Sequence, residues 1–336
     1  MRCTQLKEKK TLDLVSVQGL VLMIVILLST IGLVVHSNSI YSNDGLDPIF
    51  YSMFFGLGPE ADVAVKSSLV KESKIKILTC WINNRTDIDT WFKKWIEDGF
   101  LEQLWDKGYI IHIITYGWKE MHASQDFVDD MEVLSNMISK PDDGKHYVLF
   151  SLATEFQTYV EPNNEYNSKT ALFYDRLMFY LREAKNAIRA NSPNAKVSFC
   201  WGGWQARWED LANGGGRSMF KYFSDLMKEM DFMSFQLMQG DGNIGFPHND
   251  LEDMIDAIRP YNPHLMVAHY KPEGSNILEN QAVFNMDISN LFTNDYAAAI
   301  KQKGLFAFSF MNNIYLTDPV SLETVIQGIN AHTITE

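Results

Sequence analysis

The stretch from His146 to Pro162 places a glutamate where an enzyme built on parallel strands would carry a catalytic group. Its apolar and β-branched residues, Tyr147–Ala153, predict a buried strand that ends directly before Thr154 and Glu155. A carboxylate beside a buried strand costs free energy unless it has a partner or a task. In a barrel of parallel strands, this strand end would lie on the catalytic face. Glu155 is therefore the first candidate for acid/base chemistry.

Aromatic and amide side chains follow several other predicted strands. They are Trp81, Tyr116, Trp118, Gln157, Trp201, Trp204, Gln236, His269 and Tyr270, with the carboxylates Asp241 and Glu273 in the same loops. Trp and Tyr rings stack on the C–H faces of sugars, whereas amide and imidazole groups bond to hydroxyls. The pattern therefore predicts a carbohydrate site. Two glycines between Trp201 and Trp204 would let that loop fold back and present both rings, although either ring could simply pack over the mouth.

Eight short apolar runs alternate with longer amphipathic ones after residue 47. The predicted strands are Ile49–Phe55, Lys74–Trp81, Tyr109–Tyr116, Tyr147–Ala153, Lys196–Trp201, Phe232–Leu237, Leu265–Tyr270 and Leu305–Met311. Most are continuous apolar runs, which is typical of parallel strands covered on both faces. Helices are predicted over 61–70, 87–105, 125–137, 169–190, 218–230, 251–258, 287–303 and 319–329. Such a repeat with right-handed crossovers predicts a (β/α)8 TIM barrel over residues 48–336.

Other classes of protein fit the sequence less well. An open doubly wound sheet usually carries a glycine-rich phosphate loop, and Phe55–Pro59 lacks the third glycine of that fingerprint. The net charge of −13 argues against nucleic acid as a partner, because phosphate binding needs clustered Lys and Arg. No Cys/His cluster predicts a metal site, and no cofactor is expected. Cys80 and Cys200 are expected to be buried thiols, with a disulfide between them as the alternative.

A barrel with Ala153-Thr154-Glu155 at the end of its fourth strand resembles the large clan of (β/α)8 glycoside hydrolases. The resemblance covers roughly residues 48–330 and rests on the architecture together with that strand end. It implies an acid/base glutamate after strand four, matched by Glu155, and a nucleophile after strand seven. Thr154 stands where the clan usually has Asn. The end of strand seven holds no carboxylate, and Glu273 is the nearest one.

These features predict a glycoside hydrolase that cleaves a polysaccharide or glycan with Glu155 as acid/base. Hydrolysis needs a second carboxyl group. Glu273 is the positional choice and would suit a retaining reaction, whereas Asp241 after strand six would suit an inverting one. Further carboxylates to consider are Glu60, Glu161 and Asp318. A catalytically silent carbohydrate-binding barrel is the alternative. An esterase or deacetylase would need a nucleophile or metal ligands that the sequence does not offer.

The N-terminal 47 residues have features of targeting and not of a barrel. Residues 1–13 are basic and predict a cytoplasmic tail, and residues 14–36 contain the apolar run Gly19–Val35. We interpret this run as a signal anchor. It predicts a single-pass type II membrane protein whose barrel is extracellular or lumenal. A signal peptide cleaved near Val35–Ser37, which would give a secreted protein, is the alternative. Residues 37–47 are predicted to form a polar linker.

Overall fold

A computed structural model describes residues 47–209, 219–238, 247–272, 276–311 and 314–334. The predicted signal anchor over 14–36 lies outside these ranges and stays a prediction. Within them, no helix combines the length and the apolar character that a bilayer span requires.

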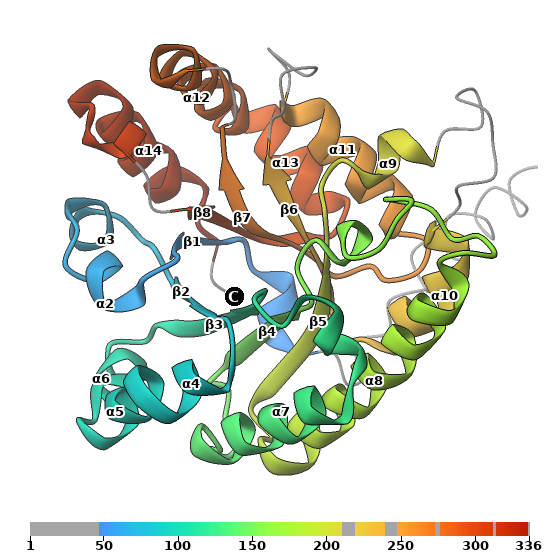
Figure 1. Ribbon diagram of the computed structural model, residues 1–336. Coiled ribbons are helices and arrows are strands. Elements are labelled where there is room, and N and C mark those ends of the chain that lie inside the picture. The colour runs from blue at the N-terminus through green and yellow to red at the C-terminus, as the bar shows by residue number, and fades with distance from the viewer. Residues whose placement is uncertain (1–46, 210–218, 239–246, 273–275, 312–313, 335–336) are drawn as a thin grey trace, which may run out of the picture. The chain divides into compact units, whose positions relative to one another are not determined.

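Eight parallel strands close into a barrel in which each strand pairs with its neighbours in sequence and β8 returns to β1. The strands are β1 (Phe54–Gly58), β2 (Ile77–Ile82), β3 (Ile110–Thr115), β4 (Val148–Leu152), β5 (Ala195–Trp201), β6 (Met233–Met238), β7 (Leu265–Lys271) and β8 (Leu305–Met311). Figure 1 looks along the barrel and shows the helices as an outer ring. The predicted (β/α)8 barrel is confirmed.

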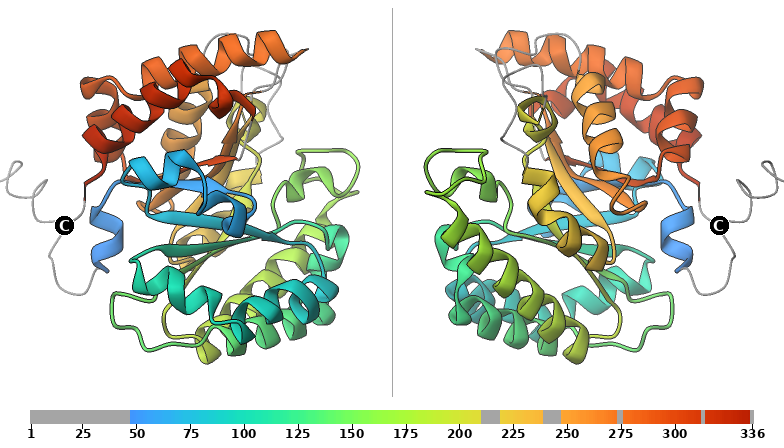
Figure 2. Two further views of the ribbon diagram at one scale, coloured as in Figure 1. Left: turned by 90° about the vertical axis from the view of Figure 1, so that its left-hand side faces the viewer. Right: turned by 90° about the vertical axis from the view of Figure 1, so that its right-hand side faces the viewer.

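Helices follow each strand and cover the outside of the barrel (Figure 2). They are α2 (Ala61–Ala64), α3 (Ser68–Glu72), α4 (Arg85–Asp87), η2 (Ile88–Phe92), α5 (Lys93–Glu97), α6 (Phe100–Asp106), η3 (Lys119–Ala123), α7 (Gln125–Met137), η4 (Phe156–Thr158), α8 (Ala171–Asn191), α9 (Gln205–Trp208), α10 (Met219–Glu229), α11 (Pro247–Ile258), α12 (Ile277–Leu291), α13 (Asn294–Gln302), η7 (Ile314–Thr317) and α14 (Pro319–His332). Side-chain caps fix some of their starts. The Ser124 side chain accepts from the Phe127 N–H before α7, and Asp318 accepts from the Ser321 N–H before α14.

The first predicted strand, Ile49–Phe55, is wrong in its first half. Residues Pro48–Tyr51 form the short helix η1, and β1 begins after it. The Phe50 ring stacks on His264 with ring centroids 4.3 Å apart and meets Phe306 edge-on at 5.0 Å. The helix η1 therefore closes the N-terminal end of the barrel with an aromatic side chain instead of extending the sheet.

Two long predicted helices are interrupted in the structure, and the shorter run 61–70 is divided into α2 and α3. The run 87–105 divides into α4, η2, α5 and α6, with a π-helical turn at η2 and a left-handed Gly99 (φ 68°) before α6. The run 287–303 is the end of α12 followed by α13, which begins after the Thr293 N-cap. In both cases the apolar spacing continues across the break, so spacing alone does not reveal it.

The barrel interior carries a small polar or imidazole side chain on six strands. These buried residues are Thr79, His112, Ser151, Ser198, Ser234 and Ser309. The Thr79 hydroxyl lies 3.0 Å from His112 Nδ1 and 3.1 Å from Ser309 Oγ. Because β2 and β8 are not neighbours, the second contact crosses the interior. Burial, and secondly His269, lowers the pKa of His112 to about 3, so this imidazole is neutral at pH 7.

Candidate active site

The alternation of side chains along each strand decides which strand-end residues face the barrel axis. Trp81 lies two positions after the inward-facing Thr79, and Gln236 lies two positions after the inward-facing Ser234. Both side chains are therefore on the inner face. In parallel barrels, the C-terminal ends of the strands form the catalytic face. We call this end of the interior the barrel mouth.

Glu155 follows β4 in a turn with a strained backbone. Ala153 and Glu155 have φ angles of 52° and 62°. This left-handed region costs an L-residue about 1–2 kcal/mol. Neighbours hold the turn in place: the Thr115 hydroxyl accepts from the Ala153 N–H at 3.0 Å, and the Tyr159 hydroxyl donates to the Thr154 carbonyl at 2.7 Å. Such enforced conformations cluster at functional sites.

The half-buried Glu155 carboxylate accepts a hydrogen bond from Gln236 Nε2 at 2.7 Å. Gln236 is itself fully buried. The loop after β5 packs closely on it, since a Cβ at Gly203 would lie 2.0 Å from the Gln236 carbonyl oxygen. Arg207, which could have paired with Glu155, instead has its Nε 3.1 Å from Asp250 Oδ1. Gln236 is therefore the residue that orients the Glu155 carboxylate.

A β-bulge directs His269 into the mouth. The pairing of β6 with β7 shifts register just before Gln236, which then pairs with His269. Bulges re-aim side chains and recur beside active sites. The His269 ring meets Trp81 with centroids 5.1 Å apart, and Trp81 lies 5.8 Å from the Tyr116 ring. Burial, and secondly Lys271, lowers the pKa of His269 to about 3, so it is a neutral hydrogen-bonding group at pH 7.

Three buried polar atoms of the mouth have no hydrogen-bond partner among the described residues. They are Trp81 Nε1, Gln236 Oε1 and His269 Nδ1. A buried polar atom left unpaired costs about 1–3 kcal/mol, and most buried polar atoms are therefore bonded. A ligand rich in hydroxyl groups would supply the missing donors and acceptors.

Trp201, predicted to contact substrate, lies elsewhere. It is fully buried on the outer face of β5, because the residue before it, Cys200, faces inward. Its ring packs against Phe156 and Phe220, each with a centroid separation of 4.7 Å. The prediction is corrected: this ring stabilises the layer between the barrel and α10.

Trp118 and Gln157 support loops and do not line the mouth. The Trp118 indole donates to Asp130 Oδ2 at 2.9 Å and is nearly buried. The Gln157 amide exchanges two hydrogen bonds with the backbone of Gly202, at 3.1 and 3.3 Å. Both side chains are thus engaged within the protein, and their predicted role in substrate binding is corrected to one in loop structure.

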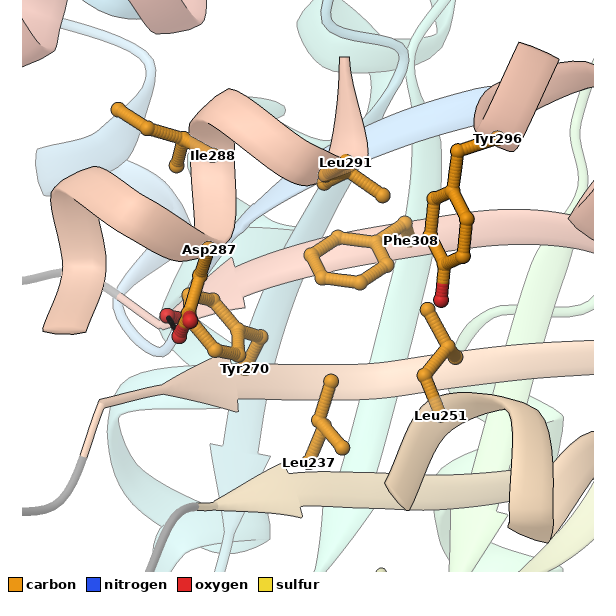
Figure 3. Close-up of a pocket in the computed structure, with 8 residues that line it drawn as sticks. All are labelled: Leu237, Leu251, Tyr270, Asp287, Ile288, Leu291, Tyr296 and Phe308. Carbon is orange, nitrogen blue, oxygen red and sulfur yellow. Dashed lines mark hydrogen bonds between the residues drawn. The ribbon is translucent and has the colours of Figure 1, made fainter. Parts of the chain in front are cut away.

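Tyr270 points away from the mouth, into the layer between the strands and α12 (Figure 3). Its hydroxyl donates to Asp287 Oδ2, and both residues line a cavity of about 20 Å³. Burial raises the pKa of Asp287 to about 8, although the bond from Tyr270 acts in the opposite direction. The predicted sugar contact of Tyr270 is therefore corrected as well.

Trp204 lies in the glycine-containing loop that follows β5. Its Nε1 donates to Asn164 Oδ1 at 2.8 Å. A Cβ at Gly202 would lie 2.6 Å from the indole, so the glycine lets the ring lie against the backbone. The ring is half-buried, and its contact with a sugar stays a prediction.

Asp241 and Glu273, the two predicted partners of Glu155, lie outside the described residues and stay predictions. Strand β7 ends in Lys271 and carries no carboxylate. Within the described ranges, no group of three or more His, Cys, Asp or Glu side chains is placed to hold a metal ion. Cys80 and Cys200 are free and buried. The alternative of a disulfide between them is therefore wrong.

A cleft of about 570 Å³ that the sequence pattern did not indicate includes Trp81 in its wall. Its wall is formed by Pro59, Glu60, Asp62, Val63, Trp81, Asn83, Asp87, Trp91 and Trp95. In the sequence, Trp91 and Trp95 fit the apolar stripe of a single helix. The structure shows that they also form the wall of this cleft, which we call the tryptophan cleft.

Comparison with known proteins bears on the fold. No family model matches the chain, and no curated protein matches its sequence. A GH5-4 broad-specificity endoglucanase from an uncultured bacterium matches with a TM-score of 0.51 and 14% identity, over 82% of this chain and 84% of its own. The GH10 structure from Paenibacillus barcinonensis matches with a TM-score of 0.51 and 10% identity, over 82% and 89%. These likenesses show a shared fold, the (β/α)8 barrel.

The chain spans less than a third of the length of another structure that it matches. A calcium-binding mutant of Bacteroides uniformis beta-glucuronidase 2 matches over 77% of this chain, with a TM-score of 0.49 and 11% identity. This chain covers only 30% of that protein.

Proposed function

We propose that the protein is a glycoside hydrolase that cleaves a glycan at the barrel mouth with Glu155 as acid/base. The observation that carries the proposal is the cluster of unpaired buried polar atoms beside a glutamate on a strained turn. Sugar hydroxyls would bond to these atoms, and Trp81 and Tyr116 would offer aromatic faces to the sugar ring. The likeness in fold to glycoside hydrolase barrels is consistent with this role.

In this proposal, the Glu155 carboxyl group donates its proton to the glycosidic oxygen as the C–O bond breaks. Gln236 holds the carboxyl in position through the bond to its side chain. A second, ionised carboxylate must attack the anomeric carbon or activate water. We keep Glu273 in that role and Asp241 as its alternative. The neutral His269 bonds to a substrate hydroxyl, and Trp204 contributes a further aromatic surface.

A carbohydrate-binding barrel without catalytic activity is the second candidate. Strand β7 places His269 and Lys271 where the clan resemblance implies a nucleophile. A protein lacking this group would hold a glycan in the same mouth without cleaving it.

A panel of neutral and charged polysaccharides distinguishes the two candidates. A hydrolase releases shorter products and new reducing ends, which chromatography and a reducing-sugar assay detect, and Glu273→Gln or Asp241→Asn abolishes the release. A binding protein is retarded by the polysaccharide in affinity electrophoresis and releases no product. If no polysaccharide is bound or cleaved, both candidates are excluded.

The Tyr159 hydroxyl gives a prediction about the turn that carries Glu155. Replacing Tyr159 by Phe removes the donor to the Thr154 carbonyl. We expect the free energy of unfolding to fall by about 1 kcal/mol. We also expect kcat to fall while KM stays nearly constant, because Glu155 is no longer held in position. Urea denaturation and steady-state kinetics measure the two effects.

Tyr222→Phe on α10 is a matched control, since Tyr222 is exposed. This control should leave both quantities unchanged. A Tyr159→Phe protein with normal kcat would show that the turn does not need this hydrogen bond.

We also propose that residues 14–36 anchor the protein in a membrane with the barrel outside the cytoplasm. The support is the apolar run Gly19–Val35 behind a basic segment. Protease protection of sealed vesicles tests the orientation. A barrel digested from the cytoplasmic side would contradict it.

A further inference from the structure

We propose that the tryptophan cleft binds a second part of the glycan chain and selects chains without acidic groups. This inference rests on the proposed function, because the same chain would run from the cleft into the mouth. The cleft volume of about 570 Å³ lies within the usual range of ligand sites. Trp81 belongs to both places: it lines the cleft, and its ring contacts His269 in the mouth.

The aromatic wall of the cleft suits sugar rings. Trp91 and Trp95 meet edge-on with ring centroids 4.7 Å apart, and both are only partly buried. Trp91 lies in η2, a π-helical turn that interrupts the regular helix. Such turns are frequent at functional sites. Rings at this angle offer both a face and an edge to the C–H groups of a sugar.

The charge of the wall limits which sugars fit. It contains the carboxylates Glu60, Asp62 and Asp87, and none of its described residues is Lys, Arg or His. Arg85, close by in the sequence, donates to Asp89 at 2.8 Å. One Asp87 oxygen already accepts a backbone N–H at 2.8 Å, whereas Glu60 is exposed and Asp62 partly exposed. Glu60 and Asp62 are therefore the carboxylates that a ligand would contact first.

Three carboxylates have different effects on different glycans. Hydroxyl groups of neutral sugars donate hydrogen bonds to them, and an ammonium group of an amino sugar would also form ion pairs. The negative charges of uronates or sulfated sugars would be repelled. The substrate class is therefore a neutral or amino-substituted polysaccharide.

Calorimetric titration of the Glu155→Gln protein tests this inference without cleavage of the ligand. The probes are cello-, xylo-, glucosamine and galacturonic acid oligosaccharides of one to six units. At least one neutral or amino series should bind more tightly as its length increases, and the galacturonic acid series should bind at least tenfold more weakly. Introducing Trp91→Ala into the Glu155→Gln protein should lower its affinity for long chains about tenfold, which corresponds to about 1.4 kcal/mol.

Two further variants separate binding from folding. Phe179→Ala removes an exposed aromatic ring on α8 and should not change affinity. Glu60→Gln removes an exposed charge at little cost in stability. It should reduce the difference in affinity between neutral chains and galacturonic acid chains. Three results would overturn the inference. The galacturonic acid series could bind as tightly as the others, no series could bind, or Trp91→Ala could leave the dependence of affinity on chain length unchanged. Because binding is measured without cleavage, an absence of hydrolysis by the unmodified protein leaves the inference standing and counts only against the proposed function.

Discussion

Replacing Glu155 by Gln will lower kcat for glycan hydrolysis by about 10³-fold, since general acid catalysis contributes roughly 10²–10⁴. Glutamine has nearly the same shape and can still accept the bond from Gln236, but it has no acidic proton for the glycosidic oxygen. The midpoint of thermal unfolding should therefore change little, and KM should stay similar. Initial rates on the polysaccharide that the unmodified protein cleaves, together with a melting curve, measure both expectations.

Glu132→Gln provides the matched control for this substitution. Glu132 is an exposed glutamate on α7, so the control changes the same functional group away from the mouth. It should leave kcat unchanged. If Glu155→Gln kept more than a tenth of the normal rate, Glu155 could not be the group that protonates the leaving oxygen.

Replacing Asp287 by Asn will remove a large pH dependence of stability. The pKa of Asp287 is about 8 in the folded protein, against an ordinary value of 3.8. A carboxyl whose pKa is raised by folding makes its full contribution to stability at a pH below its unfolded pKa. That contribution is lost as the pH rises through the folded pKa. Between pH 4 and pH 7 the loss amounts to at most roughly 4 kcal/mol.

The buried environment explains why Asn should be tolerated. It has nearly the shape of a protonated Asp, can still accept from the Tyr270 hydroxyl and stays neutral at every pH. Asp287 lines a cavity of about 20 Å³, and its Oδ1 has no partner among the described residues, so the amide group breaks no hydrogen bond made by that oxygen. The free energy of unfolding, measured by urea denaturation, should therefore differ less between pH 5 and pH 8 for Asp287→Asn than for the unmodified protein.

Asp225→Asn is a suitable comparison because the Asp225 side chain is 84% exposed. It should show the same difference between pH 5 and pH 8 as the unmodified protein. An Asp287→Asn protein whose stability still fell steeply over this range would show that another group titrates there.

The strands were predictable where turn residues border an apolar run. Leu305–Met311 has the predicted bounds because Gly304 directly precedes it. Gly304 has a φ of 107°, and a Cβ there would lie 2.0 Å from the Pro263 carbonyl oxygen. The run from Ile49 is bordered by Pro48, yet its first residues fold into η1, because Phe50 is needed to close the end of the barrel against His264. That need arises from tertiary packing, which local sequence does not express.

The strand-end tryptophans show why site residues were harder to predict. Trp81 and Trp201 both end apolar runs, yet only Trp81 faces the barrel axis. The signal that separates them is the small polar residue within each strand, Thr79 or Ser198, which occupies the crowded interior. Trp81 is two positions after Thr79 and faces inward. Trp201 is three positions after Ser198 and faces outward.

The most direct test of Glu155 as the catalytic acid uses glycosides with different leaving groups. A dinitrophenyl glycoside needs no proton to release its stable anion, whereas an alkyl glycoside does. If Glu155 is the acid, the Glu155→Gln protein will cleave the alkyl glycoside about 10³-fold more slowly than the unmodified protein. For the dinitrophenyl glycoside, the substitution will reduce the rate of cleavage of the glycosidic bond far less than it does for the alkyl glycoside. An equal loss on both substrates would contradict this role.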